Sequence, residues 1–479
     1  MVDSRLVHGG HMMYGTDELP DIIRDYSKRG FGLVCMYARD VPDGHVLEVV
    51  MAGDGVERIT ARVDGTMYRS LTSEIPGASL YEREIYETSG IYPAGHPDMR
   101  PLRSRSTWGS LSGGDAIPHN DIFGDGIFEI PVGPIHAGVI GPGHFRFSVA
   151  GEPILMMKAY LGYSRRGVEK LMETPVSYDN APIAERISGD NAVAHTLAHL
   201  QTVEQDTEIP ERARFIRTML AELERIYNHL GTMAGIALDT ALAVPAAHGN
   251  MLRESILRLN EKICGHRQLW GILRAGGLSK DVSETVLAEI ERELMRIKFD
   301  TEDLAGVMTR SPSFMDRAET TGRLSYEDAV RLRAVGPVAR ASGVNADVRK
   351  MRPYAAYDKV AFDVPICPSG DVYARMTVRK REIIESISVI IQCINEMKDG
   401  PICTDVKTKD GFYAGITESP RGETVHCAHI EGGRITRYKI RDASFPNWPA
   451  LECAVIGNIV PDFPVVNKSF DLSYSGNDL

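Results

Sequence analysis

A polar segment divides this sequence into two parts whose hydrophobic patterns differ. From Leu102 to Asp125 the chain is rich in serine, glycine and aspartate, a composition typical of an exposed linker between domains. Before this segment, apolar residues recur at the spacing of one helix and several strands, whereas beyond Ile154 they recur mainly at helical spacing. The pattern predicts an α+β fold with two domains, an α+β domain over residues 1–115 and a mainly helical domain with small β elements over residues 116–479.

Individual elements can be predicted within each domain. In the first domain we expect one amphipathic helix and three strands: Asp17–Lys28, then Gly32–Tyr37, His45–Met51 and Arg58–Val63. After the linker, the passages from Phe128 through Ile140 and over Phe145–Val149 are β-like. Five long helices then favour a bundle: Val193–Gln205, Glu211–Ala234, Met251–Leu273, Ser283–Lys298 and Asp371–Met397. The residues after Met397 are expected to form short strands and loops.

Charge and hydropathy exclude several classes of protein. The formal net charge of -11 argues against nucleic acid as a partner. No apolar run approaches the roughly 20 residues that cross a bilayer, and the N-terminal residues lack the features of a signal peptide. A cytoplasmic protein is therefore expected, and partners would have to hold it at any membrane on which it works.

The seven cysteines are scattered without a single C-x-x-C pair. An odd number at irregular spacing argues against a disulfide framework, and the lack of clustered thiolates argues against an iron–sulfur cluster in this chain. We interpret most of them as small core residues.

Specific motifs in the first domain identify a family. Tyr68–Thr72 reads YRSLT and Tyr81–Glu87 reads YEREIYE, followed by Gly90-Ile91 and by GHPDMRPL over Gly95–Leu102. This part of the chain resembles the 30-kDa subunit of NADH–quinone oxidoreductases.

The second domain resembles the 49-kDa subunit of the same enzymes, itself a relative of [NiFe]-hydrogenase large subunits. The resemblance rests on motifs spread over nearly the whole domain: Gly133–His136, Gly162–Lys170, Pro210–Ala213, Leu238-Asp239, Ala341–Val344, Asp347–Lys350, Gly370–Arg375 and Ser444–Ala450. Fusion of the two modules is typical of formate-hydrogenlyase-type, group 4 [NiFe]-hydrogenase-related complexes that conserve energy at a membrane.

The nickel ligands of that family are missing here. Where hydrogenases have E-R-I-C-G-x-C, residues 185–191 read ERISGDN, so Ser188 and Asn191 occupy the two thiolate positions. Where they have D-P-C-x-x-C, residues 471–476 read DLSYSG, with Ser473 and Gly476 at the thiolate positions. Neither serine nor asparagine supplies an anionic sulfur, and we therefore predict a nickel-free protein that is not a hydrogenase.

The quinone-binding residues of the family have also changed. The 49-kDa subunits place a histidine and a tyrosine near the quinone headgroup, and the matching positions here hold Ile140 and Gly189. His136 is retained, and a shift of register would bring in His144 or Tyr178. These changes weaken the interpretation as a quinone enzyme, and they leave two classes of electron acceptor open, a quinone or another small oxidised substrate.

The resemblance points to three candidate catalytic residues, Asp239, His136 and Ser188. Five further residues are expected to line a cavity: Arg166, Glu169, Asp190, Asn191 and Ser473. Asp239 would either relay protons with a raised pKa or cap a helix and pair with an arginine.

Several of the cavity-lining residues have a structural alternative. Arg166 and Glu169 would either shape the cavity floor or form structural ion pairs. The alternative for Asp190 and Asn191 is capping of the helix that begins near Val193.

No metal or nucleotide site is predicted elsewhere in the chain. His195 and His199 share a helix face, but Thr196 stands where the zinc signature requires glutamate, so core or interface histidines are favoured. His426 and His429 would point to opposite faces of a strand. The glycines at 141 and 143 are not followed by the third glycine of a dinucleotide fingerprint.

The resemblance implies a peripheral-arm subunit that couples electron transfer to proton or ion translocation. The implied partners are a 20-kDa-like iron–sulfur small subunit, a ferredoxin-like subunit and antiporter-like subunits of a membrane arm. Iron–sulfur clusters would reside in those partners, with no cofactor in this chain, at the inner face of the cell membrane. Two alternatives are a non-catalytic scaffold derived from a hydrogenase and a quinone reductase whose site residues have shifted.

Overall fold

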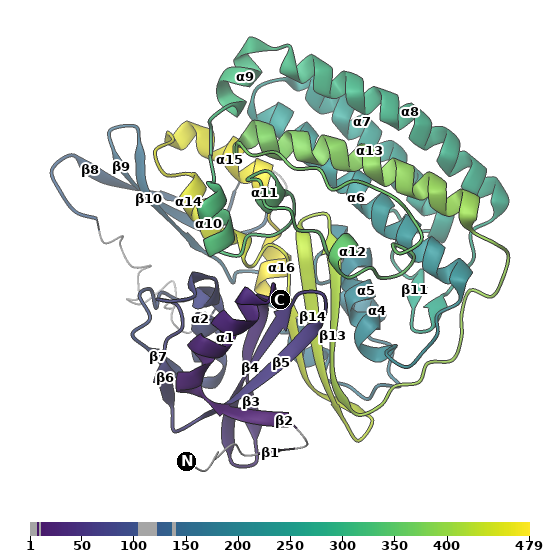
Figure 1. The fold of residues 1–479 in the computed structure, drawn as a ribbon. Helices are drawn as coiled ribbons and strands as arrows, with labels where there is room; N and C mark the ends of the chain where they lie inside the picture. The colour runs from purple at the N-terminus through teal and green to yellow at the C-terminus, as the bar shows by residue number, and fades with distance from the viewer. Residues whose placement is uncertain (1–6, 9–10, 104–121, 137–139) are drawn as a thin grey trace.

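The structure, a computed structural model, describes residues 7–8, 11–103, 122–136 and 140–479. It is an α+β protein (Figure 1) in which a mostly antiparallel sheet with two helices precedes a larger, mainly helical part. The predicted boundary between residues 115 and 116 lies outside the described residues.

The N-terminal part is a five-stranded sheet in the order β1-β2-β5-β4-β3. Its strands are β1 (Val7–His8), β2 (His11–Gly15), β3 (Gly32–Val41), β4 (Gly44–Ala52) and β5 (Val56–Val63), with only β2 and β5 parallel. Helices α1 (Leu19–Lys28) and α2 (Ser79–Ser89) pack against β3. A small parallel pair, β6 (Met67–Arg69) and β7 (Tyr92–Ala94), completes this part.

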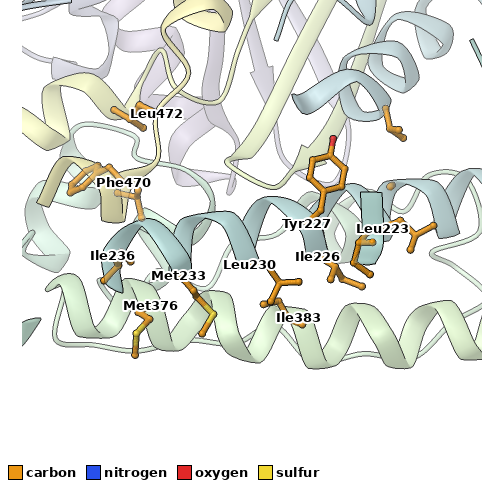
Figure 2. Close-up of a cluster of buried hydrophobic side chains, with 14 of the residues drawn as sticks. Leu223, Ile226, Tyr227, Leu230, Met233, Ile236, Met376, Ile383, Phe470 and Leu472 are labelled. Atoms are coloured by element: carbon orange, nitrogen blue, oxygen red, sulfur yellow. The ribbon is translucent and has the colours of Figure 1, made fainter. Parts of the chain in front are cut away.

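The larger part is built around one long helix, α6 (Glu211–Asp239). It packs against three helices, α7 (Ala243–Cys264), α13 (Val372–Glu396) and α15 (Phe463–Phe470). Figure 2 shows Ile226, Leu230 and Met233 of α6 pointing to α13, where Ile383 meets them, while Tyr227 points the opposite way. Each such side chain contributes about 2 kcal/mol when it leaves water, so this interface is a main source of stability.

The larger part contains further helices and strands beside α6, α7, α13 and α15. The helices are α3 (Val168–Leu171), α4 (Ala181–Ala184), α5 (Ala192–Val203), α8 (Glu284–Thr309), α9 (Pro312–Ala318), α10 (Tyr326–Arg331), α11 (Gly336–Arg340), α12 (Val348–Met351), α14 (Asn447–Ala454) and α16 (Tyr474–Asp478). The strands are β8 (Ile127–Val132), β9 (His144–Ala150), β10 (Ile154–Tyr160), β11 (Leu273–Arg274), β12 (Gly277–Leu278), β13 (Gly411–Ser419), β14 (Gly422–Glu431) and β15 (Arg434–Arg441).

The antiparallel sheet β13-β14-β15 joins the two parts of the molecule. Residues of this sheet, Ile416, Val425 and Cys427, belong to the same hydrophobic core as the N-terminal sheet. Arg441 of β15 donates its Nε hydrogen to the carbonyl of Val34 in β3 at 2.9 Å. Figure 1 shows β13 and β14 lying between the N-terminal sheet and the helices, with the C-terminal helix α16 beside them.

Three predicted elements were wrong. The segment beginning at Ile154 is a strand, because it pairs with β9 as β10 rather than starting a helix. The helix predicted over Met251–Leu273 is α7, which begins at Ala243 and ends at Cys264 because Gly265 adopts the left-handed conformation that ends helices. The tail contains long strands and then three helices, α14 to α16, in place of short strands and loops.

Candidate functional site

The two segments that lack the nickel-binding cysteines meet in the folded chain. Ser188 precedes a 3₁₀ turn over Gly189–Asn191, and Ser473 is the N-cap residue of α16. The two hydroxyl oxygens form a hydrogen bond of 2.8 Å, and the residues are only 1% and 7% exposed. We call Ser188, Asn191, Ser473 and Gly476 the serine cluster.

The donor set of the serine cluster does not fit nickel and iron. Gly476 has no side chain, and a Cβ placed there would lie 2.6 Å from Oδ2 of Asp442 and 3.0 Å from Oγ of Ser473. A fourth thiolate is therefore excluded by the position of the Asp442 carboxylate. Asn191 is fully buried, and neither its amide nitrogen nor its amide oxygen has a hydrogen-bond partner among the residues that the structure describes. Two hydroxyls and an amide cannot replace the soft sulfur ligands that such a site requires.

Asp190 is held in an ion pair beside the cluster. Its Oδ1 accepts a hydrogen bond from Ser188 Oγ at 3.0 Å, and its Oδ2 lies 2.8 Å from Nη2 of Arg421. Burial alone would raise the pKa of Asp190, but the Arg421 guanidinium lowers it below its ordinary value. Asp190 therefore stays ionised and orients the Ser188 hydroxyl.

The N-terminal end of α5, the helix that follows the cluster, is capped by a side chain of another helix. Neither Asp190 nor Asn191 caps α5; instead, the backbone N–H groups of Val193 and Ala194 donate to the carboxylate of Glu224 at 2.7 and 3.0 Å. The predicted local capping was therefore wrong, because a carboxylate from α6 already satisfies these donors. Burial raises the pKa of Glu224 to about 8, although the two N–H donors act in the opposite direction.

Arg166 connects both halves of the site. Its Nη2 donates to the carbonyl of Ile187, next to Ser188, and to the carbonyl of Ser475, both at 2.7 Å. Because Arg166 is tied to both segments, it holds the early and late parts of the serine cluster together.

Glu169 lies on the boundary with the N-terminal part. Its Oε1 accepts hydrogen bonds from Lys439 Nζ at 2.8 Å and from the Ile440 backbone N–H at 3.0 Å. Burial would raise the pKa of Glu169, but Lys439 and Arg437 lower it to about 2. It lines a cavity of about 830 Å³ together with Glu84 and Arg103 of the N-terminal part.

Asp239 lies at the C-terminal end of α6, away from the serine pair. Its backbone carbonyl accepts a hydrogen bond from Arg317 at 2.7 Å. Burial raises the pKa of its side chain, while Lys468 and Arg317 act in the opposite direction. Lys468 is itself paired with Asp471 at 2.8 Å, and Asp471 lies 3.5 Å from Arg421. Lys468 therefore acts on both Asp239 and Asp471.

Of the three residues considered for quinone, His136 and His144 both lie beside Gly133, whereas Tyr178 lines a cavity to which neither of them contributes. His136 Nε2 lies 2.7 Å from the carbonyl of Gly143, so this side chain closes the turn between β8 and β9. His144 is buried, with its Nδ1 3.4 Å from the carbonyl of Gly133. Tyr178 is 59% exposed and lines a different cavity, of about 360 Å³, next to His199.

Three residues of the site carried no signal in the sequence. Arg421, Asp442 and Glu224 are contributed by segments far from both motifs, and only packing places them beside Asp190, Gly476 and the start of α5, respectively. Within the described ranges no group of three or more His, Cys, Asp or Glu residues is arranged to hold a metal ion. Nor does that part of the chain contain a helix long and apolar enough to cross a membrane.

Comparison with known families gives two matches along the chain. Residues 15–114 match the 30-kDa subunit of respiratory-chain NADH dehydrogenase, and residues 239–412 match the 49-kDa subunit.

Similar proteins come from both enzyme classes. Formate hydrogenlyase subunit 5 of Escherichia coli is 28% identical over 96% of this chain and 87% of its own length. An NADH-quinone oxidoreductase subunit of Herpetosiphon aurantiacus is 33% identical over 72% of this chain and 96% of its own. The C/D-type NADH-quinone oxidoreductase subunit of Bacteroides fragilis is 29% identical over 84% of each chain.

Proposed function

Because the chain belongs to the family of fused 30-kDa and 49-kDa subunits of respiratory-chain NADH dehydrogenases, we propose that it works without nickel in a complex I-like, hydrogenase-related oxidoreductase. In that complex it is the peripheral-arm subunit that receives electrons from iron–sulfur partners. Electron transfer is coupled to translocation of protons or other ions across the membrane.

The side chains of the serine cluster support the part of this proposal that excludes nickel. Hydroxyls occupy two of the four thiolate positions and bond to each other at 2.8 Å. The carboxylate of Asp442 fills the space that a side chain at Gly476 would need. Asp190 and Arg421 then supply fixed charges next to the cluster, so its chemistry is that of hydrogen bonds and protons.

Elemental analysis of the native complex tests this part directly. Plasma mass spectrometry, normalised to this subunit, is expected to find iron from the partner clusters and no nickel above background. Nickel near one atom per chain would overturn the proposal and return the protein to the hydrogenases.

The partners are proposed from the relatives, whose names describe subunits of larger enzymes. We expect a 20-kDa-like iron–sulfur subunit, a ferredoxin-like subunit and antiporter-like membrane-arm subunits, which hold this chain at the inner face of the cell membrane. A quinone is the proposed acceptor, in line with the quinone oxidoreductase named among the relatives. Affinity purification of the tagged chain from its own cells, followed by mass spectrometry, should recover these partners in fixed ratio.

A non-catalytic scaffold is the second candidate, and the burial of the serine pair favours it. Ser188 and Ser473 are nearly closed to solvent, and their hydroxyls already have protein partners. A scaffold would keep the docking surfaces of the family and would catalyse no reaction at the serine cluster.

Turnover of the reconstituted complex separates the two functions. In proteoliposomes, Ser188→Ala should lower quinone-dependent turnover by at least about tenfold if the cluster takes part in proton transfer. Ser313→Ala, at an exposed serine on α9, is the matched control. Wild-type turnover in Ser188→Ala, with normal assembly, would establish the scaffold instead.

A further inference from the structure

An unbroken line of five buried side chains starts next to the serine cluster. Asp442 Oδ2 lies 3.0 Å from His195 Nε2, and His195 Nδ1 lies 3.0 Å from His426 Nε2. His426 Nδ1 is 2.8 Å from the hydroxyl of Tyr438, which is 2.9 Å from His199 Nδ1. Both ring nitrogens of His195 and of His426 are therefore used within the line.

The line connects the serine cluster with a surface cavity. At its inner end, Asp442 Oδ2 and Ser473 Oγ both lie within 3.0 Å of the point where a Cβ at Gly476 would be. At its outer end, His199 lines the cavity of about 360 Å³ that also contains Asn180 and Glu185. All five side chains lie in the protein interior, with His199 the most exposed at 3%.

Hydrogen-bond chemistry gives the line a single direction. Burial would raise the pKa of Asp442, but the His195 hydrogen bond lowers it, so the carboxylate is ionised and can only accept. With neutral imidazoles, His195 then carries its hydrogen on Nε2 and accepts at Nδ1 from His426 Nε2–H. His426 Nδ1 in turn accepts from Tyr438, whose oxygen accepts from His199 Nδ1–H. Every hydrogen in the line points towards Asp442.

Two of the buried histidines, His199 and His426, are kept neutral by their surroundings. Burial lowers the pKa of His199 to about 4. Burial, together with the neighbouring His195 and His199, holds the pKa of His426 well below its ordinary value. A charge is therefore costly inside the line, and a proton crosses it fastest when all the hydrogens shift together.

We propose that this line is a proton relay that delivers protons from the cavity beside His199 to Asp442 at the serine cluster. A hydronium ion in the cavity gives a proton to His199 Nε2 and leaves as water, and His199 Nδ1–H passes to the Tyr438 oxygen. The Tyr438 hydrogen moves to His426 Nδ1, His426 Nε2–H moves to His195 Nδ1, and His195 Nε2–H moves to Asp442. One proton enters from the cavity, one carboxylate is protonated and no electrons move. The relay deepens the proposed function, because it would supply the protons of a reduction at the cluster.

The direction of the hydrogens is tested first, by nitrogen NMR on the full chain with isotope-labelled histidine. At neutral pH, His195 and His426 should be neutral with hydrogen on Nε2, and His199 should carry hydrogen on Nδ1. Finding His195 or His426 with the hydrogen only on Nδ1, or a permanently charged His199, would overturn the relay.

Conduction is tested by exchange of the buried imidazole hydrogens with water. Tyr438→Phe keeps the ring but removes the hydroxyl that links two imidazoles, so exchange at His426 and His195 should slow by at least about tenfold. Tyr37→Phe is a matched control, because it removes another buried tyrosine hydroxyl bonded to a histidine, 2.8 Å from Nε2 of His429. Exchange in this control should match the wild-type rate. Unchanged exchange in Tyr438→Phe would overturn the proposal.

A second variant covers the case in which Tyr438→Phe does not fold. His199→Gln retains an N–H donor for Tyr438 at the cavity wall, but an amide does not pass a proton on, so the same slowing is expected. These measurements do not depend on oxidoreductase activity. A complex without that activity would contradict the proposed function, whereas the relay would still be tested by hydrogen exchange.

Discussion

The residue Gly476 determines what the serine cluster can hold. Because Gly476 has no side chain, the Asp442 carboxylate can occupy the position that a fourth ligand would need. Its Oδ2 lies 2.6 Å from the point where a Cβ at position 476 would be. Asp442 in turn bonds His195 at 3.0 Å. A side chain introduced at position 476 would therefore displace Asp442 and disturb its histidine.

The contact between the two serine segments can be tested by a disulfide. In a Ser188→Cys/Ser473→Cys variant, the sulfur atoms replace hydroxyl oxygens that are 2.8 Å apart, a separation from which small rotations reach a disulfide. We expect the bond to form under mild oxidation, so that thiol titration of the unfolded protein finds two fewer free thiols than in the reduced sample. The pair Ser188→Cys/Ser313→Cys, whose second residue lies on α9, should keep all its thiols.

The buried Glu224 should make stability depend on pH. Burial raises its pKa from 4.5 to about 8 in the folded protein, so between these values the folded state binds more protons than the unfolded state. The free energy of unfolding therefore falls as pH rises through this window, by about 1 kcal/mol per pH unit from this group. Glu224→Gln has no such group, so the free energy of unfolding of the wild type relative to that of the variant should fall as pH rises through this window. A difference that is constant from pH 4.5 to 8 would contradict the raised pKa.

From the spacing of the family motifs, the sequence predicts that Ser188 and Ser473 stand where the family has metal ligands. It could not predict their partners. Glu224 looks like an ordinary helix residue until the fold places its carboxylate at the start of α5. Tyr438 and His426 belong to an alternating strand, and their link to His195 depends on how that sheet meets α5.

At the scale of elements, α6 is buried almost all round, and its charged residues have partners on other elements. His229 Nε2 lies 2.8 Å from Glu382 of α13, and Arg340 Nη2 lies 2.8 Å from the same carboxylate. Arg349 binds Glu222 of α6 at 3.0 Å. The apolar stripe of α6 was predictable from its periodicity, but this ionic network was not, because its members are separated along the chain by α7 to α12.

The Glu382 carboxylate should be essential to the packing of α6 on α13. Glu382→Gln would leave the buried His229 without its carboxylate and remove one of the three carboxylates around Arg340, and removing one partner of a buried ion pair costs about 3–5 kcal/mol. We expect a loss of this size in denaturant unfolding, together with lower solubility. Glu396→Gln, at an exposed position near the end of the same helix, should change stability by less than about 0.5 kcal/mol. Similar stability of the two variants would show that the network contributes little.

Element boundaries were predicted less well where tertiary contacts decide them. The residues of β10 have an apolar pattern that fits a buried helix as well as a strand, and pairing with β9 selects the strand. The final helices are each short, and α16 is fixed by burial of its residues against the rest of the fold.

At the scale of the whole molecule, the two parts share a core and a buried ion cluster. Phe445 and Val425 of the larger part belong to the same apolar cluster as the N-terminal sheet. Lys439 of β15 lies 2.6 Å from Glu84 of α2 and 2.8 Å from Glu169. Such an interface predicts that the N-terminal sheet and β13–β15 unfold together, because neither can expose its side of the core alone.

Lys439→Met should weaken the interface that makes the N-terminal sheet and β13–β15 unfold together. The substitution keeps the length of the side chain but leaves Glu84 and Glu169 buried beside each other without their shared cation, at a cost of about 3 kcal/mol. Because Arg103 still pairs with Glu84 and Arg437 with Glu169, the fold should persist while the interface weakens. Hydrogen exchange followed by mass spectrometry should then show faster exchange in β3, β4 and β15, with α7 and α8 unchanged.

Lys170→Met removes an ion pair whose lysine is 84% exposed, and it should leave all these segments as in the wild type, since exposed pairs contribute little. Equal exchange in Lys439→Met and Lys170→Met would mean that the shared apolar core alone joins the two parts.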